Sequence, residues 1–204
     1  MRRVVAICGL VLLVVAGCGS DDESAPELGG WVREPLPEVG SLTLPDVAAD
    51  GAPFAFRAPE GGLLLVYFGF TACPDICPTT MSDVQQALAD LGDDAGRVEV
   101  ALVTVDPGRD TAETLDRYLG SFVAAGGHPL RTDDAGELRA VADVFGADYT
   151  VETDETGRID VGHTAHLYAV DDAGRLLVTW PFATPVDTLV DDLRILLSEG
   201  IPTT

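Results

Sequence analysis

Residues 63–78 read LLLVYFGFTACPDICP, and they combine a strand pattern with two cysteines at the start of a helix pattern. The first six residues are continuously apolar, as in a central strand that is covered on both faces. Pro78 suits the first position of a helix and disfavours the α region for the residue before it. We therefore expect a helix over residues 78–91, with Cys77 at its cap and Cys73 in the preceding loop.

Strand and helix patterns alternate along the rest of the chain. They lie at residues 98–105 (strand), 111–125 (helix), 135–145 (helix), 165–170 and 176–180 (two strands joined by a turn), and 185–198 (helix). Asp110 is the expected N-cap of the helix over residues 111–125. This order predicts an α/β protein of the thioredoxin-like fold, in which helices flank a central mixed sheet in a single domain.

The charge balance excludes one broad class of function. The chain has 204 residues and a net charge of −22, and its 12 positive charges are all arginines, because it contains no lysine. A protein that follows nucleic-acid phosphates needs a clustered basic surface, which these scattered arginines do not provide. We expect no nucleic-acid partner, and the acidic balance indicates a well-solvated surface.

The N-terminus reads as an export signal. Two arginines precede an uncharged stretch of 13 residues, too short for a stable membrane-spanning helix. Ala16 and Gly17 stand directly before Cys18, which is similar to a bacterial lipobox. We expect residues 1–17 to be a lipoprotein signal peptide and Cys18 to carry the lipid anchor. The alternative is an ordinary signal peptide with an incidental cysteine.

These patterns divide the chain into four parts. After the signal peptide, residues 18–40 form a lipidated N-terminus with an acidic, proline-containing tether that we expect to be flexible. Residues 41–199 form the folded domain, and residues 200–204 a C-terminal tail. The mature protein is then expected outside the cytoplasm, anchored by lipid to the outer face of the cytoplasmic membrane.

The chemistry of the domain centres on Cys73 and Cys77, the two thiols that remain after processing. Ligand sites in open α/β sheets favour the carboxyl ends of strands, where this pair lies. A helix N-terminus stabilises thiolates, so we expect lowered thiol pKa values, with Asp75 acting in the opposite direction. Two such thiolates are good ligands for Cu(I), and they could equally form a disulfide.

A third ligand to such a site would be a histidine. The chain has only His128, His163 and His166. His163 and His166 are three residues apart, so in an extended strand they face opposite sides and only one can meet the cysteines. His128, beside a proline, is expected in an exposed loop. No fourth ligand for a closed zinc site is evident near the cysteines.

Three motifs together resemble the Sco (SenC) family of copper-binding thioredoxin-like proteins. They are FGFTACPDICPTT at residues 68–80, VTVDPGRDT at residues 103–111 and VGHTAHLY at residues 161–168. Ala72 stands where the family often has histidine, and Gly162 where aspartate is common. The resemblance covers residues 41–199.

The resemblance implies copper ligation by Cys73, Cys77 and His163. It also implies a copper chaperone that assembles the CuA centre of cytochrome c oxidase. The partner would be subunit II of that oxidase or another extracytoplasmic cuproprotein.

The alternative function is a thiol-disulfide reductase that keeps the CuA cysteines of the oxidase reduced, with Cys73 and Cys77 as its redox-active pair. Reductases of the thioredoxin type use Cys-x-x-Cys and a cis-proline before the late strand. This chain has one more residue between its cysteines and no proline over residues 152–170, which favours metal binding. A purely structural disulfide is a further alternative, although so short a loop constrains little unfolded-state entropy.

Several other residues have two interpretations. Asp106 and Asp110 are typical of turns and helix caps, or they could support the metal site or a docking partner. Trp31 and Trp180 are expected to pack rather than to bind a partner.

Overall fold

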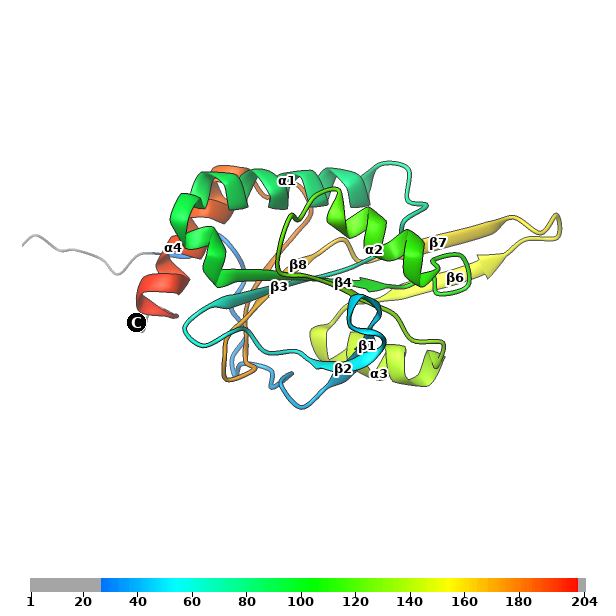
Figure 1. The fold of residues 1–204 in the computed structure, drawn as a ribbon, viewed down its shortest axis with the longest axis horizontal. Coiled ribbons are helices and arrows are strands. Elements are labelled where there is room, and N and C mark those ends of the chain that lie inside the picture. Colours follow the sequence, from blue (N-terminus) through cyan, green and yellow to red (C-terminus); the bar gives the residue numbers. More distant parts are fainter. Residues whose placement is uncertain (1–26, 202–204) are drawn as a thin grey trace, which may run out of the picture.

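The structure is a computed structural model, and it describes residues 27–201. A seven-stranded mixed sheet runs through its centre (Figure 1). In spatial order its strands are β2 (Ala52–Ala55), β1 (Thr43–Asp46), β5 (Gly127–Leu130), β4 (Val98–Thr104), β3 (Leu63–Gly69), β8 (Leu167–Val170) and β9 (Leu176–Trp180). β3, β4 and β5 are parallel, whereas β8 runs antiparallel to β3.

Helices cover both faces of this sheet. α1 (Ile76–Leu91), α2 (Ala112–Gly120) and α4 (Val186–Glu199) lie on one face, and α3 (Ala135–Phe145) lies on the other (Figure 1). Two short 3-10 helices, η1 (Val47–Ala49) and η2 (Gly92–Arg97), complete the connections. All seven residues of β3 are buried, as a strand with helices on both sides must be. The predicted single-domain thioredoxin-like fold is confirmed.

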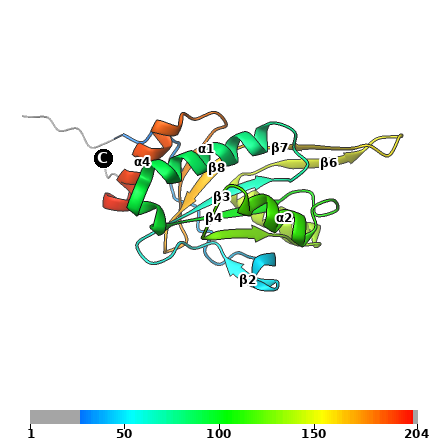
Figure 2. The ribbon, with the colours of Figure 1, turned by 45° about the horizontal axis from the view of Figure 1, so that its top comes forward.

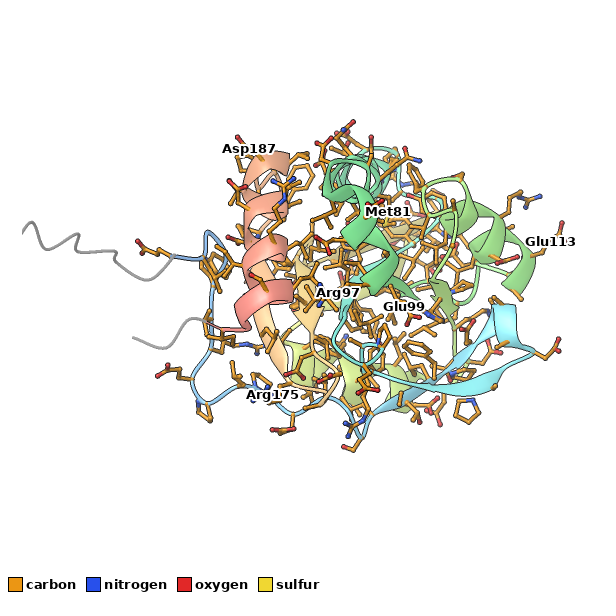
Figure 3. The ribbon with its side chains drawn as sticks, turned by 60° about the vertical axis from the view of Figure 1, so that its left-hand side comes forward. Met81, Arg97, Glu99, Glu113, Arg175 and Asp187 are labelled. Atoms are coloured by element: carbon orange, nitrogen blue, oxygen red, sulfur yellow. The ribbon has the colours of Figure 1, made fainter. Side chains whose placement is uncertain are left out.

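Side chains follow this layering. Met81 of α1 is fully buried against the sheet, while Glu113 and Asp187 lie on the outer sides of α2 and α4 (Figure 3). α1 and α4 pack beside each other on the face of the sheet opposite α3 (Figure 2). The apolar residues that define each helix pattern therefore form one continuous core with the strands.

Two elements have the boundaries that the sequence predicts. α3 spans Ala135–Phe145, with Asp134 accepting hydrogen bonds from the backbone N–H groups of Gly136 and Glu137. β9 spans Leu176–Trp180, and the turn before it contains Gly174 at a φ of 82°. A left-handed conformation at that position favours glycine.

Three helix starts differ from the prediction, and that of α4 differs only by lying one residue later, at Val186. α1 begins at Ile76 rather than at Pro78, so Cys77 is helical. This is possible because the first-turn N–H groups of a helix have no intrahelical partner, and proline is therefore tolerated at its third position. α2 is capped by Thr111 rather than by Asp110, and it ends at Gly120 instead of residue 125. The Asp110 side chain instead binds threonines of two other segments.

A second sheet of two strands, β6 (Tyr149–Thr153) and β7 (Ile159–His163), projects from the domain as a hairpin (Figures 1 and 2). The sequence prediction contains neither strand. Both runs alternate apolar and polar residues, with Tyr149 and Val151 in β6 and Ile159 and Val161 in β7. This strand signal was therefore present, although most of the side chains are exposed. The hairpin leaves the domain at the same end as the loop that precedes α1.

Residues 27–40 pack against the domain, which differs from the flexible tether predicted for this segment. Trp31 exchanges two backbone hydrogen bonds with Thr179 of β9, at 2.8 and 2.9 Å. The backbone N–H groups of Gly29 and Gly30 donate to the buried Asp192 carboxylate, at 2.9 and 3.1 Å. These bonds hold the segment against an otherwise open sheet edge.

The predicted signal peptide over residues 1–17 and the predicted lipidation site Cys18 lie outside the described residues. Within residues 27–201, none of the helices has the length and apolar character needed to cross a membrane.

Candidate metal centre

The site forms where β3 ends and α1 begins. Gly69 is the last residue of β3, and a Cβ atom at this position would lie 2.7 Å from the Tyr67 ring and 3.2 Å from Cys77 Sγ. Any larger residue would displace the ring or the thiol, so the glycine permits the close approach of strand and helix. The chain then turns, with the Cys73 backbone N–H donating to the Phe70 carbonyl at 3.3 Å.

Both predicted cysteines face the same point. Cys73 is half-buried in the loop, and Cys77 is fully buried at the second residue of α1. The Cys77 backbone N–H donates to Cys73 Sγ at 3.3 Å. Both residues carry free thiols, so neither is engaged in a structural disulfide in this structure.

His163 reaches this pair from the end of β7. Its Nε2 lies 3.3 Å from Cys77 Sγ, and its Nδ1 lies 3.3 Å from the Thr164 carbonyl oxygen. Because a carbonyl can only accept, the Nδ1–H tautomer satisfies this contact and leaves the Nε2 lone pair towards the thiol. The two Sγ atoms and a ring nitrogen of His163 lie within 4.8 Å of one another, and this group could hold a metal ion.

Aromatic rings enclose the histidine. The Tyr67 and Phe70 rings meet His163 edge to face, with ring centroids 5.9 and 5.7 Å away. Both aromatic residues are buried, so they fix the imidazole and exclude water from its sides. The sequence prediction did not include these two residues in the site, although Phe70 lies in the motif over residues 68–80 and Tyr67 directly precedes it.

Burial controls the ionisation of the ligand atoms. Desolvation raises the pKa of Cys77 to about 12, against a weaker lowering by a hydrogen bond with the Phe70 backbone. The predicted lowering of the pKa is therefore wrong for Cys77, because the loss of water on burial is the largest influence on its pKa. Burial also lowers the pKa of His163, which keeps the imidazole neutral and able to ligate.

The other two histidines lie elsewhere. His166 packs edge to face on the exposed Trp31, at a centroid distance of 5.4 Å, and is not part of the cluster. Of His163 and His166, only His163 meets the cysteines, which confirms the prediction that only one of them can do so. The reason differs, however, because the two histidines do not share a strand: β7 ends at His163, and β8 begins only at Leu167.

The prediction that His128 lies in an exposed loop is wrong. It is half-buried in β5, where Nδ1 lies 2.8 Å from Asp46 and Nε2 lies 3.2 Å from Glu99. Its ring also stacks against Phe54 at 4.2 Å. The sequence prediction did not include this short parallel strand, which contains Pro129.

The two aspartates of the second motif differ in their contacts. Asp106 is buried and pairs with the Arg109 guanidinium, and its carbonyl closes the turn by accepting from the Asp110 N–H at 3.0 Å. The turn interpretation is confirmed for Asp106. The Asp110 carboxylate instead accepts from Thr71 in the cysteine loop and from Thr104 of β4. Trp180 is fully buried, in agreement with a packing role.

Comparison with known proteins shows one consistent relationship. The SCO1/SenC family model matches residues 41–198. A SCO2-like protein of Rickettsia prowazekii is 33% identical over 124 residues, which make up 58% of this chain and 58% of the relative. The chain spans about three fifths of the length of the curated relatives that it matches.

Solved structures agree with this match. The apo Sco1 protein of Thermus thermophilus is 31% identical, with a TM-score of 0.69 over 83% of this chain and 97% of that one. Two similar structures contain copper. Bradyrhizobium japonicum ScoI is 29% identical, with a TM-score of 0.63 over 75% and 95% of the two chains. Arabidopsis thaliana ScoI is 26% identical, with a TM-score of 0.65 over 75% and 94%.

The two thiols should differ in reactivity in the reduced, metal-free protein. Iodoacetamide should modify the half-buried Cys73 first. The raised pKa of Cys77 lowers its thiolate fraction at neutral pH about a thousandfold relative to an ordinary thiol. Its alkylation rate should therefore keep rising with pH beyond pH 9. Peptide mass spectrometry measures both rates, and a Cys77 rate that levels off near pH 8 would contradict the burial argument.

Proposed function

The chain belongs to the SCO1/SenC family, and from that membership we propose that it is a copper-binding protein that delivers copper to an extracytoplasmic cuproprotein. The CuA centre in subunit II of cytochrome c oxidase is the proposed recipient. The observation that carries this proposal is the convergence of Cys73, Cys77 and His163 within 4.8 Å. The copper in the solved relatives from Bradyrhizobium japonicum and Arabidopsis thaliana supports the choice of metal.

The donor set fits copper in both oxidation states. Two thiolates are soft ligands that suit Cu(I), and an added imidazole suits Cu(II). The Thr164 carbonyl, by accepting from Nδ1, orients the imidazole as outer-shell partners of metal sites do. Copper binding must displace the proton of the buried Cys77 thiol, so affinity should fall as the pH is lowered.

We propose further that the protein acts from a lipid anchor. In this proposal residues 1–17 are removed, Cys18 carries the lipid, and residues 27–40, which pack against the domain, belong to the folded part. The anchor then attaches the domain to the outer face of the cytoplasmic membrane.

The anchor can be tested by replacing Cys18 with serine. The full-length Cys18→Ser protein should leave the membrane fraction or remain unprocessed, because stable attachment depends on the acyl chains. Cell fractionation with immunoblotting measures both properties. A Cys18→Ser protein that is processed and membrane-bound as before would exclude the anchor.

The proposed ligands make different contributions. Cys73→Ser or Cys77→Ser should abolish tight Cu(I) binding. His163→Ala should leave weaker Cu(I) binding and lower Cu(II) affinity by more than the roughly 10–100-fold caused by loss of an outer-shell partner.

His166→Ala is the matched control, because this nearby histidine lies outside the cluster. It should bind both ions as the unaltered protein does. Competition with chromophoric copper chelators measures the affinities, and equal losses in the two histidine variants would contradict the proposed ligand set.

One experiment separates copper delivery from thiol-disulfide reduction. Delivery needs both thiolates and the imidazole, whereas disulfide exchange needs only the thiols. If the protein delivers copper, His163→Ala should impair oxidase activity in cells almost as severely as Cys73→Ser. Immunoblotting should confirm equal protein levels. Near-normal activity of cells with His163→Ala would instead support the reductase function.

A further inference from the structure

Asp110 is a buried carboxylate whose surroundings consist of hydrogen-bond donors. Its side chain accepts from Thr71 Oγ1 at 2.6 Å, from the Thr71 backbone N–H at 3.1 Å and from Thr104 Oγ1 at 2.6 Å. The residue has no exposed surface, and within residues 27–201 no arginine pairs with its carboxylate. Three donors stabilise a carboxylate at this position, which would otherwise be costly to bury.

These bonds connect the cysteine loop to the rest of the domain. Thr71 lies two residues before Cys73, Thr104 ends β4, and Asp110 precedes α2. In the described part of the chain, the other hydrogen bonds of residues 71–75 go to neighbouring residues: Cys73 bonds with Phe70 and Cys77, and Asp75 accepts from Thr79. Asp110 is thus the polar attachment of this loop to a distant segment.

This attachment bears directly on Cys73. Unlike Cys77, which is fixed by burial at the second residue of α1, Cys73 is only half-buried and lies in a loop. Its Sγ nevertheless lies within 4.8 Å of the other two ligand atoms. A loop that is already ordered loses less conformational entropy when the metal binds. Its attachment to Asp110 therefore raises the affinity of the site for the metal.

We infer that Asp110 is a positioning residue for the metal centre: through Thr71 it holds the loop that presents Cys73 to Cys77 and His163. The copper-affinity measurement that tests this inference rests on the proposed copper function. The sequence left two roles open for Asp110, namely helix capping or support of the metal site. Because Thr111 is the cap of α2, the inference assigns Asp110 the supporting role.

The test uses two variants that weaken the attachment in different ways and leave the backbone N–H of residue 71 in place. Thr71→Val removes the hydroxyl donor and keeps the carboxylate, and Asp110→Asn removes the carboxylate at nearly constant volume. Thr71→Ser is the conservative rescue because it retains the hydroxyl. Asp192→Asn is the matched control, since Asp192 is equally buried and accepts three hydrogen bonds, from Trp180, Gly29 and Gly30, away from the loop.

Two readouts are measured on the full chain. The first is Cu(I) affinity by chelator competition. The second needs no metal: the equilibrium with glutathione gives the effective concentration of the Cys73 and Cys77 thiols for each other. Thr71→Val and Asp110→Asn should each lower both quantities about tenfold, the effect of losing a charge-assisted hydrogen bond. Thr71→Ser and Asp192→Asn should stay within about twofold of the unaltered protein.

Each outcome bears on the inference. If Thr71→Val matches the unaltered protein in both readouts, or if Asp192→Asn falls as far as Asp110→Asn, the positioning role is excluded. If Asp110→Asn fails to fold, the comparison of Thr71→Val with Thr71→Ser decides. If the unaltered chain binds no copper, the proposed function fails, and the glutathione equilibrium still tests Asp110 independently.

Discussion

The contact between Cys77 Sγ and His163 Nε2, at 3.3 Å, joins segments 86 residues apart in the sequence. One side of it depends on β3, whose buried side chains fix the start of α1 and whose terminal Gly69 lets the thiol approach Tyr67. The other side depends on the β6–β7 hairpin, which carries His163 back to the end of the sheet. Sheet, helix and hairpin therefore converge on one point, where two soft sulfur donors meet one imidazole.

The same burial that assembles the centre also determines its resting state. Water is excluded by Tyr67, Phe70 and the first turn of α1, so the Cys77 thiol keeps its proton and His163 stays neutral. In the metal-free protein, the Cys77 thiol is consequently a poor nucleophile. Cys73, Cys77 and His163 are nevertheless already oriented to bind a metal ion. A metal ion supplies the positive charge that stabilises a buried thiolate, which favours metal binding over rapid disulfide exchange as the use of this pair.

Much of this architecture could be predicted, and the rest shows where local pattern is insufficient. β3 and β9 were predictable from their continuous apolar runs, and α3 from the glycine at residue 146 that ends the helix. The hairpin of β6 and β7 was missed even though both of its strands alternate apolar and polar residues, which is a strand signal. The packed segment over residues 27–40 has the composition of a tether and is held by a distant carboxylate, Asp192. The pKa of Cys77 depends on burial, which the position of a helix start does not reveal.

The central claim is that one copper ion binds two thiolates and one imidazole of this chain. X-ray absorption spectroscopy of the protein loaded with one equivalent of Cu(I) tests it most directly, because sulfur and nitrogen neighbours scatter differently. We expect two sulfur neighbours and one nitrogen neighbour around the copper ion. A copper ion surrounded by three or four sulfur atoms, as in a cluster shared between molecules, or one with no nitrogen neighbour, would contradict it.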